Sequence, residues 1–171
     1  MKIYHLETVE STNDKAKAFP PGTVIVADRQ TKGRGRLDRA WESGSGGLWC
    51  SMVLKPERRP FEYTFAVSLA VLKSLPEGVD AAIKWPNDII CQDKKLCGIL
   101  TEAVYSGASP ERIILGVGLN TNNTPPKEGI SLASILDGEI DNLELLRDII
   151  SRFESFIRME RKELLKSYRR N

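Results

Sequence analysis

The stretch AAIKWPNDIICQDKKLCGILTEAVY, residues 81–105, carries the clearest secondary-structure pattern of this chain. Apolar and β-branched residues form three runs within it, which a Pro-Asn-Asp sequence and a polar Asp93-Lys94 pair separate. Runs of this kind, bounded by turn-forming residues, are typical of antiparallel strands joined by hairpins. The stretch therefore predicts a strand, a turn at 86–88, a second strand, a tight turn at 93–94 and a longer third strand.

The flanking sequence adds strands and helices to this core. Alternating or β-branched patterns predict strands at 2–9, 22–30, 46–54 and 112–123. Apolar spacing and capping residues predict a short helix that begins at Ser11 or Thr12, and longer helices over 61–75 and 141–157. Strands that follow one another through hairpins, with helices gathered apart from them, indicate an α+β fold rather than a doubly wound parallel sheet.

Length and composition limit the class of protein. A chain of 171 residues predicts a single domain over 1–171, and 41% apolar with 28% charged residues is typical of a soluble globular protein. A net charge of only +2 weakens any interpretation as a general nucleic-acid binder. No apolar run approaches the ~20 residues of a membrane span, and the N-terminus lacks the apolar run of a signal peptide.

Cysteine and histidine usage narrows the chemistry further. The three cysteines form no CxxC pair, so buried thiols in a reducing cytoplasm fit better than disulfides or a zinc site. His5 is the one histidine of the chain, and a structural or surface role is expected for it.

The segment TKGRGRLDRAWE, residues 31–42, joins three arginines and a lysine with two glycines. Glycines let backbone N–H groups turn toward an anion, and arginines supply forked donors of permanent charge. The segment, hereafter the arginine loop, therefore predicts phosphate binding. A solvated basic loop and a nucleic-acid-binding segment resembling RGG sequences are the alternatives. Trp41 can anchor the loop by packing, which favours an ordered role.

A mixed set of polar groups lies at the corner IKWPNDII. Lys84, Asn87 and Asp88 offer a cation, an amide and a carboxylate, the combination that nucleotide or metal–phosphate chemistry requires. The alternative is an ordinary turn whose side chains bond their own backbone.

Two further motifs lie on predicted strands. In DKKLCGILTEA, Lys95 precedes an apolar strand, Gly98 leaves room for a ligand, and Glu102 needs a partner if it is buried. In LGVGLNTNN, two glycines flatten a strand and asparagines follow it. This second motif is not the dinucleotide fingerprint, because no helix pattern opens at its glycines.

Taken together, these motifs resemble those of the biotin–protein ligases. The matching motifs occur in that family's order and with similar spacing: STN at 11–13, GRGR with Arg39 and Trp41 after it, KWPND at 84–88, KKLCGIL at 94–100 and GVGLN at 116–120. The resemblance covers roughly 10–120, and ISLASILDGE at 130–139 resembles the stretch that follows. It implies an α+β catalytic domain with a mixed β-sheet flanked by helices, related to class II aminoacyl-tRNA synthetases.

The resemblance also implies a reaction. Biotin and ATP would give biotinyl-5′-AMP and pyrophosphate, and biotin would then pass to one lysine of a biotin carboxyl carrier protein. Magnesium would arrive with ATP, and Asp88 is the candidate ligand for it. The implied catalytic residues are Lys95, Arg34, Arg36, Lys84 and Asp88. Those for biotin are Ser11, Thr12, Asn13, Gln30, Gly33, Arg34, Arg36, Trp49, Lys95, Gly98 and Leu100. Those for ATP and the adenylate are Arg34, Arg36, Arg39, Trp41, Lys84, Asn87, Asp88, Lys95 and Asn120.

The sequence departs from the family pattern in three places. Asp38 stands where relatives often have glycine, and its carboxylate can offset the charge of Arg36 and Arg39. The chain begins at the first predicted strand and ends at KSYRRN, so we expect neither an N-terminal helix-turn-helix nor a C-terminal β-barrel, and no DNA-binding repressor activity. The basic tail, 158–170, is expected to be a solvated helix end. A homodimer through a sheet edge is a further expectation.

Three rival functions come from different classes. A lipoate–protein ligase of related fold would activate another carboxylate. A non-catalytic biotin- or nucleotide-binding module would keep the pocket without the chemistry, although the joint presence of the arginine and lysine motifs argues against it. An RNA-binding protein would use the arginine loop, but the sequence lacks the aromatic platform expected of one.

Overall fold

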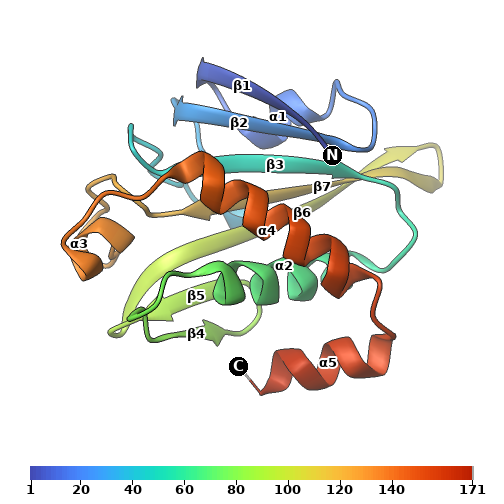
Figure 1. Cartoon of the computed structure of the whole chain (residues 1–171). Coiled ribbons are helices and arrows are strands. Elements are labelled where there is room, and N and C mark those ends of the chain that lie inside the picture. Colours follow the sequence, from blue (N-terminus) through green and yellow to red (C-terminus); the bar gives the residue numbers. More distant parts are fainter. Residues whose placement is uncertain (171) are drawn as a thin grey trace.

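A seven-stranded mixed β-sheet forms the centre of the computed structural model, which describes residues 1–170 apart from the side chain of Asp38 (Figure 1). The spatial order is β1-β2-β3-β7-β6-β5-β4. Strands β1 and β2 run parallel and all other neighbours run antiparallel, so the predicted mixed sheet is confirmed. Strands β1 and β4 are its edges, and a homodimer through an edge stays a prediction. The strands are β1 (Lys2–Val9), β2 (Thr23–Gln30), β3 (Leu48–Leu54), β4 (Ala81–Lys84), β5 (Asp88–Cys91), β6 (Lys94–Ser106) and β7 (Ser109–Leu119).

The stretch 81–105 forms the predicted pair of hairpins, β4–β5 and β5–β6. The tight turn lies one residue earlier than predicted. Gln92 and Asp93 have φ angles of 51° and 59°, whereas Lys94 already pairs with Cys91 in the ladder. Two central residues with positive φ are the usual solution for a two-residue hairpin, because their twist matches that of the strands.

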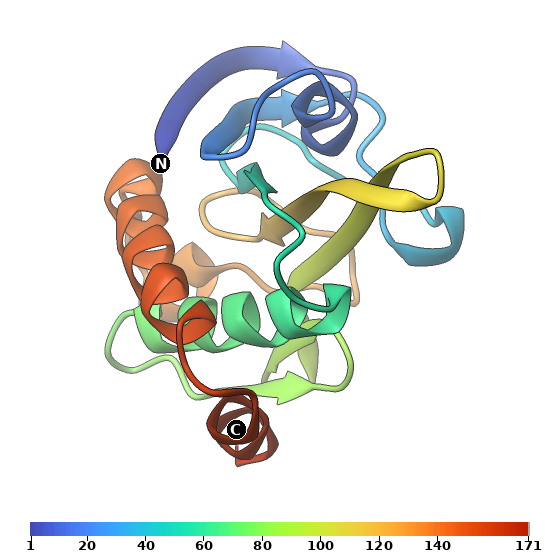
Figure 2. The same cartoon turned by 90° about the vertical axis from the view of Figure 1, so that its right-hand side faces the viewer.

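Helices cover the two faces of the sheet unequally (Figure 2). Helices α2 (Pro60–Ser74) and α4 (Asn142–Ile157) lie on one face and α1 (Thr12–Ala16) on the other, with Ser11 as the N-cap of α1. The alternation of strand side chains separates two apolar clusters: Val24 and Met52 face α2 and α4, and Ile25 and Val53 face α1. A short helix, α3 (Leu132–Leu136), follows β7, and the turn η1 (Arg36–Asp38) lies in the arginine loop.

No helix in the described part of the chain combines the length and the apolar character that crossing a membrane requires.

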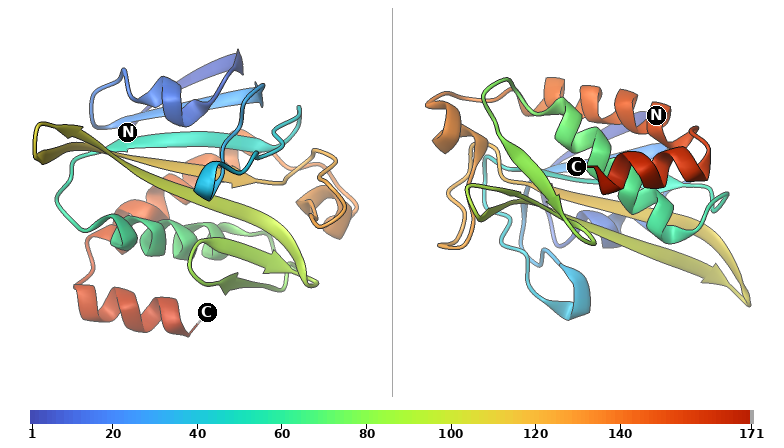
Figure 3. Two further views of the ribbon diagram at one scale, coloured as in Figure 1. Left: turned by 180° about the vertical axis from the view of Figure 1, so that it is seen from behind. Right: turned by 90° about the horizontal axis from the view of Figure 1, so that it is seen from below.

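The basic tail is not a solvated helix end, which corrects the prediction. Residues Arg161–Arg169 form a separate helix, α5, that packs against α2 (Figure 3). Leu164 and Tyr168 are four residues apart, so they lie on one face of α5, and both are buried. The Tyr168 ring stacks on Phe65 with 3.9 Å between centroids, and its hydroxyl donates to the Pro86 carbonyl at 2.9 Å. The burial of these two side chains therefore fixes α5 against the domain, although most residues of the helix are charged.

Phe153 on α4 gives a test of this packing. Its side chain is 1% exposed and belongs to the cluster between α4 and the sheet. We expect Phe153→Ala to lower the free energy of unfolding by about 3–5 kcal/mol, because it leaves a cavity. Ser151→Ala, an exposed position on the same helix, is the control and should change stability by no more than ~0.5 kcal/mol. Equal urea midpoints for the two variants would contradict the placement of this face.

Candidate active site

Two adjoining cavities lie on the sheet face that carries α1 and the arginine loop. The smaller, about 50 Å³, is the inner cavity, and the larger, about 360 Å³, is the outer cavity. Five residues line both and define the junction between them: Gly35, Arg36, Trp41, Asn87 and Lys95. These residues come from the arginine loop, the β4–β5 loop and β6, so the motifs that lie far apart in the sequence meet here.

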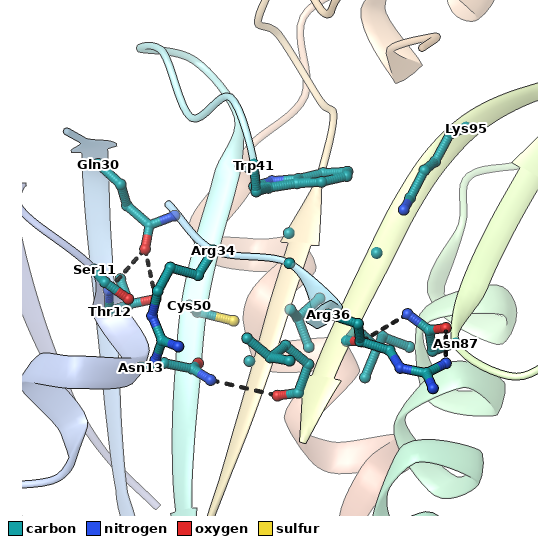
Figure 4. A pocket seen from close by; sticks show the side chains of 17 residues that line it. Ser11, Thr12, Asn13, Gln30, Arg34, Arg36, Trp41, Cys50, Asn87 and Lys95 are labelled. Carbon is teal, nitrogen blue, oxygen red and sulfur yellow. Dashed lines mark hydrogen bonds between the residues drawn. The ribbon is translucent and has the colours of Figure 1, made fainter. Parts of the chain in front are cut away.

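The closed end of the inner cavity is built from neutral polar groups (Figure 4). The Gln30 side-chain carbonyl accepts from the Thr12 backbone N–H at 2.7 Å and from the Thr12 hydroxyl at 3.0 Å. The Ser51 hydroxyl donates to the side-chain carbonyl of Asn13 at 2.6 Å. Because Ser11 caps α1, this short helix holds Thr12 and Asn13 against β2 and β3. The end suits a small neutral group with both donors and acceptors.

Glycines on β6 and β7 let side chains lie directly on the sheet. A Cβ at Gly116 would lie 2.2 Å from Asn13 Oδ1, and one at Gly118 would lie 2.4 Å from Trp41 Nε1. At Gly98 a Cβ would approach both Lys95 Cε and Trp41 at 3.2 Å. The room that the sequence predicted at Gly98 is therefore used by the chain's own tryptophan and lysine.

The arginine loop closes on itself as a small hairpin. The Trp41 N–H donates to the Gly33 carbonyl at 2.9 Å, and Gly35 N–H donates to the Arg39 carbonyl at 2.7 Å. The predicted ordered role of Trp41 is confirmed, since its ring covers Gly118 and packs edge-on against Trp49 at 6.4 Å. Its indole N–H is buried and has no hydrogen-bond partner among the described residues. A ligand acceptor would satisfy this donor.

Lys95 is held at the junction by two contacts. Its ammonium lies 2.9 Å from an Asp88 oxygen and 4.9 Å from the centre of the Trp41 ring. Both contacts leave the cation facing the two cavities that it lines. Arg36 reaches the same junction from the arginine loop, where its guanidinium donates to the side-chain carbonyl of Asn87 at 2.9 Å. Among the described residues, no carboxylate pairs with Arg36 at the junction.

Arg34 lines the inner cavity and pairs with two carboxylates, and its predicted role toward biotin and phosphate stays a prediction. Its guanidinium donates to Asp14 at 2.9 Å and to both oxygens of Glu102 at 3.0 Å. Desolvation would lower the pKa of Arg34, but the hydrogen bond and charge of Glu102, followed by those of Asp14, raise it. Glu102 also accepts from Asn13 at 2.6 Å. The geometry gives Arg34 an anchoring role between α1 and β6.

The outer cavity is lined by Arg39, Asp88 and Asn120, whose contact with a nucleotide stays a prediction, together with a segment that the sequence prediction missed. The 126–129 segment lines this cavity, and its Glu128 carbonyl accepts from the Lys95 N–H at 2.9 Å. The Pro125-Pro126 pair and Gly129 were the available signal, since such residues mark ordered turns. Asn120 is buried and donates to the Lys95 carbonyl at 3.2 Å, so it supports Lys95.

Three predicted residues do not line either cavity. Trp49 is fully buried, and its indole N–H donates to the Gly44 carbonyl at 2.8 Å. Its ring packs edge-on against that of Trp41. Lys84 is exposed on the edge strand β4, and Gly33 closes the arginine loop. The predicted roles of Trp49 toward biotin and of Lys84 toward phosphate stay predictions. The predicted effect of the Asp38 carboxylate falls outside the described residues.

The described residues offer neither a reactive cysteine nor a cluster of metal ligands. All three cysteines are free and buried, as predicted. Cys50 lines the inner cavity, but burial raises its pKa to about 12, so the thiol stays protonated and is a poor nucleophile. Within residues 1–170, no group of three His, Cys, Asp or Glu side chains could hold a metal ion. Asp88 as a magnesium ligand stays a prediction.

Gly118→Ala tests the arrangement of Trp41. The added Cβ must displace the indole ring, because the nearest atoms belong to the ring itself. We expect a red-shifted tryptophan emission and a loss of about 1–3 kcal/mol in the free energy of unfolding. Gly44→Ala is the matched control, because a Cβ there meets nothing within 4 Å. An unchanged emission spectrum for Gly118→Ala would refute the placement of Trp41.

Comparisons of this chain with known proteins agree on one family. Residues 5–120 match the model of the "Biotin/lipoate A/B protein ligase family". The chain is 36% identical over 170 residues to the bifunctional ligase/repressor BirA of Bacillus subtilis, covering 89% of this chain and 52% of that protein. It is 31% identical to the biotin--[acetyl-CoA-carboxylase] ligase of Paracoccus denitrificans, covering 70% of this chain and 55% of that protein. The chain thus spans about half the length of these curated relatives.

Solved structures agree with the sequence matches. The biotin protein ligase from Aquifex aeolicus in complex with biotin and ATP superposes with a TM-score of 0.82 and 34% identity, covering 91% of this chain and 70% of that one. The Leishmania major biotin protein ligase in complex with biotinyl-5-AMP gives a TM-score of 0.81 and 26% identity, covering 99% and 80%. The predicted fold and the predicted resemblance are both confirmed. The chain therefore belongs to the biotin/lipoate A/B protein ligase family and, within it, to the biotin protein ligases.

Proposed function

We propose that this protein activates biotin with ATP to biotinyl-5′-AMP and transfers biotin to a specific lysine of a biotin carboxyl carrier protein. The observation that carries the proposal is the convergence of Arg36 and Lys95, from two separate segments, at the junction of two cavities. The solved relatives that bind biotin with ATP, or biotinyl-5-AMP, support the same reaction.

The inner cavity is assigned to the ureido end of biotin and the outer cavity to the nucleotide. The ureido ring of biotin is neutral and carries two N–H donors and one carbonyl acceptor, which the amide and hydroxyl groups of Thr12, Asn13 and Gln30 can match. The biotin carboxylate would then lie at the junction. The outer cavity is larger, and Asp88 and Asn120 are available there to the nucleotide.

The first step joins two anions. A carboxylate oxygen of biotin forms a bond to the α-phosphorus of ATP, and the bond to pyrophosphate breaks with its electron pair on the leaving group. Repulsion between the carboxylate and the triphosphate opposes this approach, so fixed cations are the main catalytic requirement. Arg36 and Lys95 supply them. Magnesium, which keeps mostly phosphate and water ligands, would neutralise further phosphate charge when ATP binds.

The second step transfers the biotinyl group. The neutral amine of the acceptor lysine forms a bond to the anhydride carbonyl carbon, and the carbon–oxygen bond to AMP breaks with its electron pair on AMP. The extra proton of the new amide nitrogen goes to solvent. Because the anhydride is sensitive to water, the hairpin of the arginine loop beside the junction has a protective role.

The direct test is pyrophosphate release that depends on both biotin and ATP. Lys95→Gln should lower this rate by about 10²–10³-fold, because it removes a preorganised donor from the developing charge. Lys94→Gln is the matched control, since Lys94 is the exposed neighbour on the same strand. Release without biotin, or equal release with lipoate in place of biotin, would contradict the proposal and favour the lipoate–protein ligase.

Arg36 gives a separate prediction about retention of the intermediate. Arg36→Gly removes the guanidinium that faces the junction and donates to Asn87, so the variant should still form the adenylate but release it. The expected result is biotinylation of bystander lysines on an unrelated protein such as serum albumin, detected by blotting. Arg36→Lys keeps the charge and should label bystanders much less. If Arg36→Gly retains the adenylate as tightly as the parent, the arginine loop does not hold the intermediate.

A further inference from the structure

A third hollow, hereafter the aromatic groove, lies beside the junction and has a volume of about 430 Å³. Phe61 and Phe65 of α2 form one wall, and Trp85 and Pro86 of the β4–β5 loop form the other. The Trp85 side chain is 75% exposed, although most of the other large apolar side chains of the described chain are buried or half-buried. An exposed aromatic residue on the rim of a groove is a typical feature of a binding surface.

The aromatic groove is continuous with the candidate active site. Arg36 and Asn87 line its inner end, and these two residues also line the inner and outer cavities. Their hydrogen bond, at 2.9 Å, is the boundary between the groove and the junction. A group that lies in the groove therefore points at the place where the carboxylate and the phosphate are expected to meet.

The polar groups of the groove do not favour a nucleotide base. The hydroxyls of Thr64 and Thr101 lie 2.7 Å apart and hydrogen-bond to each other. A base needs donors and acceptors along its edge as well as an aromatic face, and the outer cavity offers these at Asp88 and Asn120. The groove instead suits an occupant with a long apolar stem and one polar end.

The charges around the groove also limit which chemical group can bind in it. Among the described residues that line the groove, Arg36 is the one that carries a charge, and none is a carboxylate. An apolar wall and a neighbouring guanidinium both disfavour an ammonium and favour a neutral amine. A lysine side chain has the required shape, because its methylene stem packs on aromatic surfaces while its amine extends beyond them. Only the neutral amine is a nucleophile.

We infer that the aromatic groove receives the acceptor lysine, with its stem against Trp85 and its amine directed past Arg36 and Asn87 to the junction. The inference rests on the proposed function and identifies where the acceptor protein docks. The acceptor would present a lysine flanked by apolar side chains, since Phe61 and Pro86 add apolar surface on the two sides of the groove.

The experiment separates the two half-reactions. Biotin-dependent exchange of labelled pyrophosphate into ATP needs no acceptor, whereas transfer to a purified biotin carboxyl carrier domain does. Trp85→Ala should leave the exchange rate within about twofold of the parent and raise the KM for the carrier domain by about tenfold, the loss of one good aromatic contact. Trp85→Phe keeps an aromatic face and should recover most of the effect. Tyr105→Ala, at another exposed aromatic residue near the β6–β7 turn, is the matched control.

Each other outcome overturns the inference for a different reason. An unchanged KM for the carrier domain means that the acceptor does not use the groove. A raised KM for ATP in the exchange reaction places the adenine ring there instead. If the parent protein itself shows no biotin-dependent exchange, the proposed function is wrong and the docking site falls with it. The thermal unfolding midpoint of Trp85→Ala checks that the substitution has not changed the stability of the fold.

Discussion

The close approach of side chains to a glycine-bearing part of the sheet is the constraint on which the site depends. Gly116 and Gly118 on β7 leave space for Asn13 and Trp41 to lie flat on the sheet surface. Any side chain at these positions would lift α1 or the arginine loop away from the strands. The inner cavity, the cation–π contact of Lys95 and the shared junction all follow from this contact.

Two of the three arginines of the loop have different roles. Arg34 gives its charge to Glu102 and Asp14, which fixes the loop to β6 and α1. Arg36 contacts the neutral side-chain amide of Asn87 instead, and no carboxylate of the described residues pairs with it. Lys95 combines the two situations. It forms an ion pair with Asp88, and it also lines both cavities. A loop with several cations can thus be anchored by one and act through another, which motif matching alone does not distinguish.

Much of the fold was predictable from the sequence because it follows from local patterns. The runs within 81–105 alternate as strands must, and the apolar stripe of 141–157 has helical spacing. The candidate site was predictable only in part. Which carboxylate meets Arg34 depends on a contact between residues 68 positions apart, and whether Lys84 faces a cavity depends on the orientation of an edge strand. The exposed position of Lys84 and the burial of Trp49 beneath Trp41 are tertiary facts, and no motif encodes them.

The C-terminal helix has a consequence for the site that its basic composition conceals. Tyr168 donates its hydroxyl to the carbonyl of Pro86, the residue before Asn87, and its ring stacks on Phe65. Desolvation, aided by the charge of Asp88, raises the pKa of Tyr168 to about 12, so the phenol remains a donor throughout the physiological range. The turn that presents Asn87 to Arg36 is therefore held from behind by α5, while Trp85 on the same turn stays exposed. A turn fixed at Pro86 and open at Trp85 can keep the junction rigid and still offer a surface to an incoming chain.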